Sequence, residues 1–432
     1  MPDREKLSGL GPCSRTEGQR RRNLSLALDC VARESGRISR ARIAAGTGLN
    51  RSTVGSLVDE LVGGGLVHEV GQAGTARVDE GGPAPAARAG RPPTVLALSP
   101  RGPVALGLDV NVDYVAACLV DLAGSVRYEH VIAQDQRGRT MTDVLNRVCH
   151  LAQDALRAVT GGGRALCGTA VAVPGLVDLS GGILALAPNL GWQDLDVVKV
   201  LRHQGMPDPI TLDNESNFAA LSETELVRDR ESFLYVNGQF GVGAGIVIDG
   251  ELYRGQHGWS GEIGHTIVVP DGPECACGRR GCLETYAGHE AVLRAAGLRH
   301  PASTSLGLRP TVSLIRERAE HGDARTVEAL RHTGTVLGVV VAGCLNILDM
   351  DRVVLGGIYR DLSPWIAPAV GRELASRICT IGRPRPAVKV ARHGAQAPAL
   401  GAARSVVRDL IRDPVLWLAR AGRTGRPTAG PP

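Results

Sequence analysis

Apolar residues recur at helical spacing in the first part of the chain. Between residues 20 and 33 the apolar positions lie three or four apart, at Leu24, Ala27, Leu28 and Val31. A shorter helix is predicted from Ser39, whose hydroxyl suits a helix start, to about residue 45. After a glycine-containing turn at residues 46 to 49, Asn50 can cap a third helix. The glycines at 63 to 65 end this helix, whose apolar face is Val54, Leu57, Val58, Leu61 and Val62.

The second and third of these segments form a predicted helix-turn-helix, because a short turn containing glycine joins them. The third, as the recognition helix, carries small polar residues and an arginine at its exposed start, where such helices contact base edges in the major groove. The candidate DNA-binding residues are Arg40, Asn50, Arg51, Ser52, Thr53 and Ser56. A three-helix unit that does not touch DNA has the same spacing, so periodicity alone leaves both interpretations open.

Residues 66 to 70 and 94 to 98 have the pattern of two strands that pair and enclose a long loop, which predicts a winged helix-turn-helix. The loop is rich in Gly, Ala and Pro and ends in Gly90-Arg91-Pro92-Pro93. A rigid segment that presents an arginine can enter an A·T-rich minor groove, so Arg91 is a further DNA-binding candidate. The same segment would also serve as a plain linker.

From residue 104 the pattern changes to short, continuously apolar runs. Strands are predicted at 104 to 110, 114 to 121 and 125 to 132, then a helix from 141 to 159 and a strand from 165 to 173. A second series of strands begins near residue 233, and helices are predicted at 313 to 330 and 331 to 348. Strands followed by a helix and another strand indicate an α/β fold, and the repeated series indicates two related lobes with a cleft between them.

Length and charge refine this picture. The chain has 432 residues, enough for two or three domains, and 43% of them are hydrophobic. No apolar run reaches the roughly 20 residues that a membrane helix needs, and the N-terminus is polar, so we expect a cytoplasmic protein without a membrane partner. Residues 1 to 102 contain 15 Lys and Arg against 10 Asp and Glu, which accounts for the net charge of +5. An excess confined to one end favours a nucleic-acid-binding module joined to a neutral body.

A histidine and cysteines are clustered between residues 265 and 282. The members are His265, Cys275, Cys277 and Cys282, separated by nine, one and four residues. Thiolate and imidazole ligands at short spacing suit a tetrahedral zinc site in which the protein fills every position, which is a structural site. Two carboxylates, Glu262 and Glu284, bracket the cluster, so the metal is expected to fix the shape of a small-molecule pocket.

The clustered cysteines could instead include a disulfide or a redox pair. The remaining cysteines are scattered singly, as buried small apolar residues usually are. Because no signal peptide is visible, we expect a reducing compartment, which disfavours a disulfide.

Taken together, these motifs resemble those of the ROK family of repressors and sugar kinases, over residues 20 to 410. The carriers of the resemblance are the helix-turn-helix, the cysteine cluster, Pro174-Gly175, Asn189-Leu190-Gly191-Trp192, Asn214-Glu215-Ser216-Asn217, Gly261-Glu262-Ile263-Gly264-His265 and Val354-Leu355-Gly356-Gly357. The resemblance implies a ribonuclease H-like (actin-like ATPase) body of two lobes that binds a sugar between them. It also implies the sugar-contacting positions Asn189, Asn214, Glu215, Glu262, His265 and Glu284.

The expected domains follow from these segments. They are a disordered tail at 1 to 19, the winged helix-turn-helix at 20 to 82, a linker with the wing's return strand at 83 to 102, the first lobe at 103 to 213, the second lobe with the zinc site at 214 to 390, a C-terminal helix packing on the first lobe at 391 to 418, and a disordered tail at 419 to 432.

Kinase activity is expected to be lost. Kinases of the family carry Asp-x-Gly-Gly-Thr after the first strand, whereas this chain has Asp109-Val110-Asn111-Val112-Asp113, in which side chains replace both glycines. Glu215 stands where the family's catalytic base is Asp, and a misplacement of about 1 Å can cost on the order of a hundredfold in rate. We therefore expect no catalytic residue, with Glu215 marking the altered base position.

The leading hypothesis is a sugar-responsive DNA-binding transcriptional regulator that acts as a repressor. Its expected partners are an operator duplex, a sugar or sugar phosphate, and further copies of the chain in a homodimer or homotetramer. The first alternative is an active ATP-dependent sugar kinase with an accessory DNA-binding domain. The second is a DNA-bound regulator that no longer senses sugar.

Overall fold

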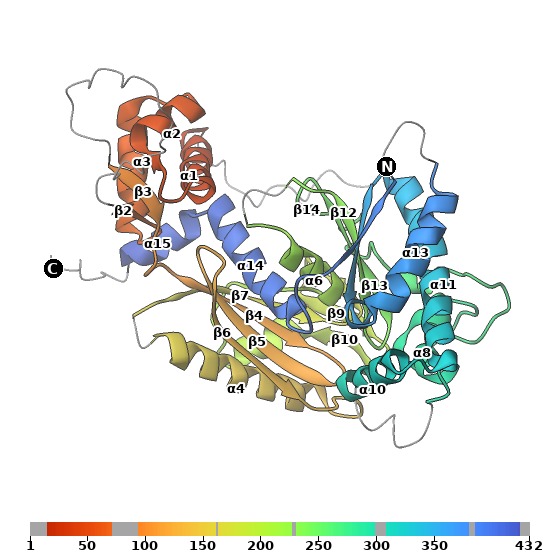
Figure 1. Ribbon diagram of the computed structural model, residues 1–432. Helices are drawn as coiled ribbons and strands as arrows, with labels where there is room; N and C mark the ends of the chain where they lie inside the picture. The colour runs from red at the N-terminus through yellow and green to blue at the C-terminus, as the bar shows by residue number, and fades with distance from the viewer. Residues whose placement is uncertain are drawn as a thin grey trace, which may run out of the picture.

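The computed structural model describes residues 15–70, 94–160, 163–226, 230–298, 308–379 and 385–423. Figure 1 shows a small N-terminal domain beside a larger body of two lobes. The predicted tail segments 1–14 and 424–432, and the wing loop with Arg91, lie outside the described residues.

The N-terminal domain has the predicted helix-turn-helix. Its elements are α1 (Arg15–Arg33), β1 (Ile38–Ser39), α2 (Arg40–Thr47), α3 (Arg51–Gly63), β2 (Val67–Val70) and β3 (Val95–Leu98). The Ser39 side chain accepts a hydrogen bond from the Arg42 N–H, and the Asn50 side chain accepts one from the Thr53 N–H, so both predicted caps are confirmed. β3 pairs with β2 and β1, which confirms the return strand of the wing.

Both lobes are built on a five-stranded sheet, and the two sheets have the same strand order. The first lobe contains β4 (Val104–Val110), β5 (Tyr114–Asp121), β6 (Val126–Ala133), β7 (Leu166–Val173) and β11 (Ile210–Asn214). The second lobe contains β12 (Phe233–Gly238), β13 (Val242–Ile248), β14 (Glu251–Leu252), β15 (Arg352–Gly357) and β16 (Ala387–Val390). In each, an antiparallel meander of three strands is extended by two parallel strands on the side of its first strand. This repeated order confirms the two related halves of a ribonuclease H-like fold.

Helices cover both faces of the two sheets. Between the sheets lie α6 (Glu215–Glu223), against β12 and β13, and α14 (Ala397–Arg412), against β4 and β7. On the outer faces lie α4 (Met141–Thr160) in the first lobe, and α11 (Ala324–Leu348) and α13 (Ser363–Arg377) in the second. By length and composition α11 could cross a membrane, a test that core helices of globular proteins also pass. Half of its most apolar stretch is buried within the lobe.

Smaller elements complete the rim of the cleft. In the first lobe these are β8 (Leu176–Asp178), β9 (Ile183–Ala187), β10 (Trp192–Asp196) and α5 (Val197–His203). In the second lobe they are η1 (Ile263–His265), α7 (Glu284–Ala287), α8 (His289–Ala295), α10 (Leu308–Glu320) and α12 (Ile358–Asp361).

Some predicted boundaries were wrong. The break between the long helices lies at residues 321 to 323, where Asp323 caps α11, and not at residue 330. α1 begins at Arg15, inside the predicted tail. The sequence prediction missed this start because the first turns of the helix are polar and carry no apolar period. At the other end, α15 (Val415–Arg423) also extends into a predicted tail.

The C-terminal helices connect the body to the N-terminal domain. α14 packs on the first lobe, whereas α15 packs on the N-terminal domain: the Trp417 indole N–H donates to the Gly64 carbonyl, 2.9 Å away, at the end of α3. Arg21 of α1 pairs with Asp413 between the two helices, with Nε 2.9 Å from Oδ1. A single hydrophobic cluster runs from Leu24 through Val407 to Trp417, so the domain and the first lobe share one core.

Candidate functional site

A pocket between the lobes contains every predicted sugar-contacting residue. The first lobe contributes Asn189, and the junction of β11 and α6 contributes Asn214 and Glu215. The second lobe contributes Glu262, His265 and Glu284, from the short elements beside β13. Residues that are far apart in sequence therefore converge on one cavity, as expected for a ligand site between two lobes.

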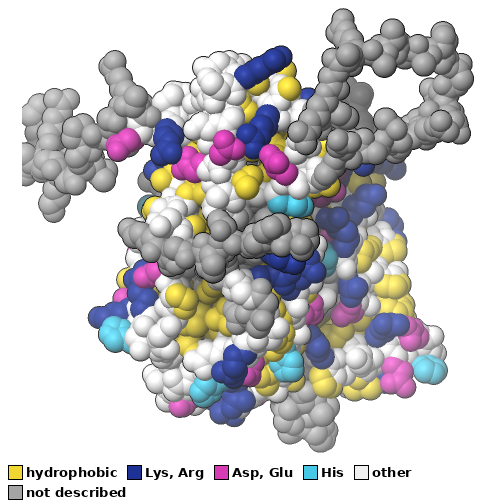
Figure 2. All heavy atoms as spheres, turned by 90° about the vertical axis from the view of Figure 1, so that its left-hand side faces the viewer, with side chains coloured by type: hydrophobic (Ala, Val, Ile, Leu, Met, Phe, Trp, Pro, Cys, Tyr) yellow, Lys and Arg dark blue, Asp and Glu magenta, His cyan; other side chains and the backbone are white. Residues whose placement is uncertain are grey.

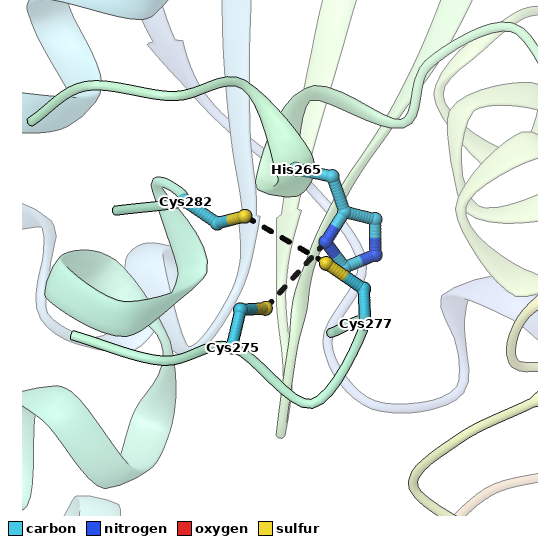
Figure 3. Close-up of side chains that lie close together, drawn as sticks. All are labelled: His265, Cys275, Cys277 and Cys282. Atoms are coloured by element: carbon cyan, nitrogen blue, oxygen red, sulfur yellow. Dashed lines mark hydrogen bonds between the residues drawn. The ribbon is translucent and has the colours of Figure 1, made fainter. Parts of the chain in front are cut away.

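Four potential metal ligands lie beside this pocket, and two of them, His265 and Cys277, line it. The ligand atoms of His265, Cys275, Cys277 and Cys282 all lie within 4.8 Å of one another. Figure 3 shows the imidazole and the thiols pointing toward a common centre. The sulfur atoms of Cys277 and Cys282 are 3.7 Å apart, well beyond the roughly 2.05 Å of a disulfide bond. The cysteines are therefore free thiols that could hold a metal ion, and the disulfide alternative is wrong.

The two ring nitrogens of His265 face different groups, one the cysteines of the cluster and the other Glu262 in the pocket. Its Nδ1 lies 3.8 Å from the Cys275 sulfur, and its Nε2 lies 3.9 Å from Oε2 of Glu262. A metal ion on Nδ1 would leave Nε2 to donate its proton to a carboxylate or a ligand oxygen. The second nitrogen thus connects the cluster to the ligand space.

Glu215 and Asp109 are buried carboxylates without full hydrogen bonding. Oε2 of Glu215 and Oδ1 of Asp109 have no hydrogen-bond partner among the described residues. Burial raises the pKa of Glu215 well above its usual range, and the nearby Asp109 and Glu262 add to this. Burial raises the pKa of Asp109 to about 7, opposed by the hydrogen bond from the Tyr114 hydroxyl. Glu215 lines the pocket, where its carboxyl group could bind a ligand hydroxyl.

Glu284 is held in place by the glycine loop of the second lobe. Its Oε2 accepts a hydrogen bond from the Val242 N–H at 3.1 Å. A Cβ on Gly241 would lie 2.3 Å from the same oxygen, so the carboxylate can approach the backbone only because residue 241 is glycine. Burial raises the pKa of Glu284.

Asn214 has a local structural role in addition to its place in the pocket. Its side-chain oxygen accepts from the Ser216 N–H at 2.7 Å and caps α6, and its Nδ2 donates to the Gly175 carbonyl at 3.0 Å. These bonds use the oxygen and one N–H, and they join β11 to the Pro174-Gly175 turn. Asn189 is exposed in the open part of the pocket.

Sequence reasoning did not assign Asn111 and Gln239 to the ligand pocket. Both line it, Asn111 from the loop after β4 and Gln239 from the loop after β12. The Asn111 side chain accepts from the Val112 N–H at 2.8 Å, and the Gln239 side-chain oxygen is buried without a partner among the described residues. In the sequence, both residues stand where the family's phosphate loops carry a different, glycine-rich pattern. That difference could have indicated a ligand contact, but it was used only as evidence against kinase activity.

The candidate DNA-binding residues differ in their surroundings. Arg51, Ser52 and Ser56 are exposed on α3, while Asn50 and Thr53 are joined by the capping bond. Arg40 pairs with Asp59 at 2.8 Å and Glu69 at 2.9 Å within its own domain. Figure 2 shows basic and acidic side chains interspersed over the upper part of this face, which carries the N-terminal domain. Arg51, at the start of α3, has no ion-pair partner among the described residues, in contrast to Arg40.

Comparison with known proteins decides the family. Residues 105–408 match the ROK family, and residues 26–71 match the IclR helix-turn-helix domain. The chain belongs to the ROK family.

Similar ROK proteins include regulators with the same two-part organisation. The chain is 29% identical to the xylose repressor of Bacillus subtilis over 379 residues, covering 87% of this chain and 92% of the repressor. It is 27% identical to the DNA-binding transcriptional dual regulator NagC of Escherichia coli, covering 80% and 83% of the two chains. The matches with both regulators extend over most of their length and most of this chain.

Solved structures show the same fold. A ROK family transcriptional regulator described as a homologue of the Escherichia coli MLC protein superposes with a TM-score of 0.75 at 22% identity, covering 93% of this chain and 99% of that one. A ROK glucokinase from Streptomyces griseus gives a TM-score of 0.58 at 24% identity, covering 69% of this chain and 98% of the glucokinase. The kinase therefore matches the body, while the regulator matches the body and the N-terminal domain together.

Proposed function

We propose that this ROK protein is a sugar-responsive DNA-binding repressor. The observation that carries the proposal is the joining of a helix-turn-helix domain to a cleft in which polar residues of two lobes converge. The relatives that share both parts over most of their length are named as sugar-linked repressors. Because the DNA-binding domain and the polar cleft are separate parts of the chain, a ligand in the cleft acts by favouring one arrangement of these parts over another.

The DNA-binding part is α3. Its N-terminal residues Arg51, Ser52, Thr53 and Ser56 would contact base edges and nearby phosphates, with Asn50 at the cap and Arg40 and Arg91 closer to the backbone or the minor groove. One recognition helix reads one half-site, so we propose that the chain acts as a homodimer or homotetramer on a palindromic operator in the cytoplasm. A substitution of Arg51 that relaxes sequence preference would mark it as a base-reading residue.

The charge of the cleft favours an uncharged sugar. The pocket is lined by three glutamates, Glu215, Glu262 and Glu284, and by no Lys or Arg among the described residues. Carboxylates and amides bind sugar hydroxyls well, whereas a phosphate ester placed among them would lack a cation to compensate its charge. Xylose and N-acetylglucosamine head the test panel, since one relative is named xylose repressor and another, from Escherichia coli O6:H1 and 27% identical to this chain, is named N-acetylglucosamine repressor.

We propose zinc as the metal of the histidine-cysteine cluster. Zinc–sulfur bonds of about 2.3 Å at the tetrahedral angle place two sulfur ligands about 3.8 Å apart. The sulfur atoms of Cys277 and Cys282 are 3.7 Å apart, and an imidazole with three thiols is a closed structural donor set. The ion would hold the segment with Glu262 and His265 against the one with Glu284.

An ATP-dependent sugar kinase is the second candidate function. The presence of the Glu215 carboxyl group in the cleft favours it. The loop after β4 argues against it, since Asp113 places a carboxylate there that is bound to the Leu308 N–H at 2.7 Å. Phosphoryl transfer depends on backbone amides and cations around the phosphates, and this loop offers acids instead.

A gel-shift titration on the chain's own promoter tests the proposal. We expect specific binding at moderate salt that is weakened at least tenfold by one uncharged sugar and not by its phosphate ester. Glu262→Gln should keep DNA binding and lose the sugar response, while Glu317→Gln, an exposed change on α10, should keep both. Absence of specific DNA binding at any salt would refute the proposal, and sugar-dependent ADP release at 1 to 100 per second, a usual enzyme range, would establish the kinase.

A further inference from the structure

A separate cavity of about 560 Å³ lies between the N-terminal domain and the body. The N-terminal domain lines it with Ala32, Ser35 and Leu98, and the body lines it with the turn between β5 and β6 and with Arg392, His393 and Arg404. None of these residues belongs to the cleft between the lobes. A molecule in this cavity would contact both parts of the protein.

The basic residues of this cavity are only partly neutralised. Glu223 is buried, and its carboxylate accepts hydrogen bonds from the backbone N–H groups of Arg392 and His393 and lies 3.3 Å from Nε of Arg392. Arg392 and Arg404 also donate to the Glu223 and Ser222 carbonyls at the end of α6. This capping accounts for Arg392, because cations are favourable at a helix C-terminus.

Capping does not account for all of Arg404. Its Nη1 donates to the Ser222 carbonyl at 2.7 Å, but its Nε is buried and has no hydrogen-bond partner within the part of the chain that the structure describes. Burial, reinforced by the charge of Arg392 and opposed by that of Glu223, lowers the pKa of this guanidinium. Among the described residues that line the cavity, Glu225 at the exposed rim carries a carboxylate. A buried cationic donor without a partner is costly to maintain.

The opposite wall offers a further donor. The Ser35 hydroxyl oxygen accepts from the Leu98 N–H at 3.0 Å, which leaves its own O–H free to donate. Donors from the N-terminal domain and from the body thus face the same space.

We propose that this cavity binds a small oxyanion, a phosphate or the phosphate group of a larger metabolite, between Arg404 and Arg392 on the body and Ser35 on the N-terminal domain. The ligand fits only while the two parts are docked, so it stabilises the docked arrangement by mass action. The site is independent of the sugar cleft and gives the protein a second input.

Thermal unfolding of the full chain tests the site. Inorganic phosphate is titrated against potassium chloride at matched ionic strength, with a hexose 6-phosphate and the free hexose in parallel. We expect a saturable rise in Tm of about 1 to 3 °C with phosphate, absent in Arg404→Gln. Arg412→Gln is the matched control, because Arg412 lies on the same helix and pairs with Glu251 outside the cavity.

Ala123→Asp provides a second variant in case Arg404→Gln folds poorly. Residue 123 is exposed at the cavity rim, so the substitution adds a negative charge without removing a side-chain contact, and it too should abolish the rise. A larger rise with the hexose phosphate than with phosphate would identify a metabolite as the source. An equal rise in wild type and Arg404→Gln, or no saturable rise in wild type, would overturn the site. The effect should persist in Glu262→Gln, so its failure is distinct from failure of the sugar response.

Discussion

Asp109 and Glu215 are carboxylic acids enclosed near the cleft, and each has one oxygen without a hydrogen-bond partner among the described residues. Asp109 is fully buried on β4, and its Oδ2 accepts the Tyr114 hydroxyl at 2.7 Å. The oxygen of the same hydroxyl lies 3.1 Å from the Ala395 carbonyl oxygen, just before α14. Asp109 is therefore connected through Tyr114 to Ala395, which lies in the segment that leads through α14 to the N-terminal domain.

Asp109→Asn should remove a pH-dependent loss of stability. The pKa of Asp109 is raised to about 7 in the folded state, against 3.8 for the ordinary group, so the folded state retains a proton that the unfolded chain has lost. Stability is therefore lost as pH rises from about 4 to 7. Asn cannot ionise, and its oxygen can still accept from Tyr114. We expect wild type and variant to have similar Tm at pH 4.5 and the variant to be higher by a few degrees at pH 8, as measured by calorimetry. A lower Tm for the variant at pH 8 would contradict this.

Gly241→Ala should weaken sugar binding without unfolding the protein. The new Cβ would lie 2.3 Å from Oε2 of Glu284, and a flexible carboxylate can move away, losing its bond to Val242. We expect sugar affinity to fall at least tenfold, as measured by calorimetry, because the displaced Glu284 carboxylate no longer meets the sugar hydroxyl. The Tm of the variant should stay within about 2 °C of that of the wild type. Gly343→Ala is the control, because nothing lies within 4 Å of its Cβ position, and it should leave affinity unchanged.

At the scale of elements, α14 and α15 connect the two parts of the chain. α14 is buried between the lobes, and after Asp413 the chain turns into α15, whose Trp417 is hydrogen bonded to the end of the recognition helix. Leu418 packs closely against Gly64, where a Cβ would lie 2.2 Å from its Cδ2. The position of α3 relative to the body is thus tied to a segment of the body itself.

Trp417→Phe should weaken DNA binding while leaving sugar binding intact. Phe keeps much of the apolar contact but leaves the Gly64 carbonyl without its donor, a loss of about 1 kcal/mol. We expect a several-fold weaker operator affinity by fluorescence anisotropy and an unchanged sugar Kd. Leu416→Ala, on the same helix but 67% exposed, should change neither value. Equal operator affinities for wild type and Trp417→Phe would show that the contact does not position α3.

At the scale of the whole molecule, the proposed ligand site is formed where the two lobes and the histidine-cysteine cluster meet. Asn189 and Glu284 belong to different lobes, and the cluster brings the segments carrying Glu262 and Glu284 together. The DNA-binding helix is far from the cluster in the chain and belongs to another domain.

Removing the metal should separate sensing from DNA binding. Chelation, or Cys277→Ser, would remove the zinc ion that we propose for this cluster, so the adjacent wall of the cleft would loosen. We expect zinc near one per chain in the purified protein by mass spectrometry, loss of sugar affinity by more than tenfold after its removal, and operator affinity within about twofold. Cys344→Ser, an isolated half-buried cysteine, should retain both metal and sugar binding.

Much of the architecture could be read from local patterns. Ser39 and Asn50 identified the helix starts, and the alternation of apolar strands identified the two α/β series, because caps and side-chain periods are local properties. The break between α10 and α11 was misplaced although Gly322-Asp323 marks it, because the apolar period continues across both helices and masks the cap. The early start of α1 was missed because its first turns are polar.

The sequence by itself determined the identity of the chemical groups: the histidine and thiols at metal-binding spacing, the acids around them, and the polar start of the recognition helix. Only the tertiary structure decided that Asn189 and Glu284 of different lobes line one pocket, and that α15 contacts both parts of the protein, through Trp417 at the end of α3 and through Arg420 at the Asp208 carbonyl of the first lobe. The physical reason is range. Ligand type and helix caps depend on neighbours in the chain, whereas orientation and docking depend on contacts between residues hundreds of positions apart, which no local pattern encodes.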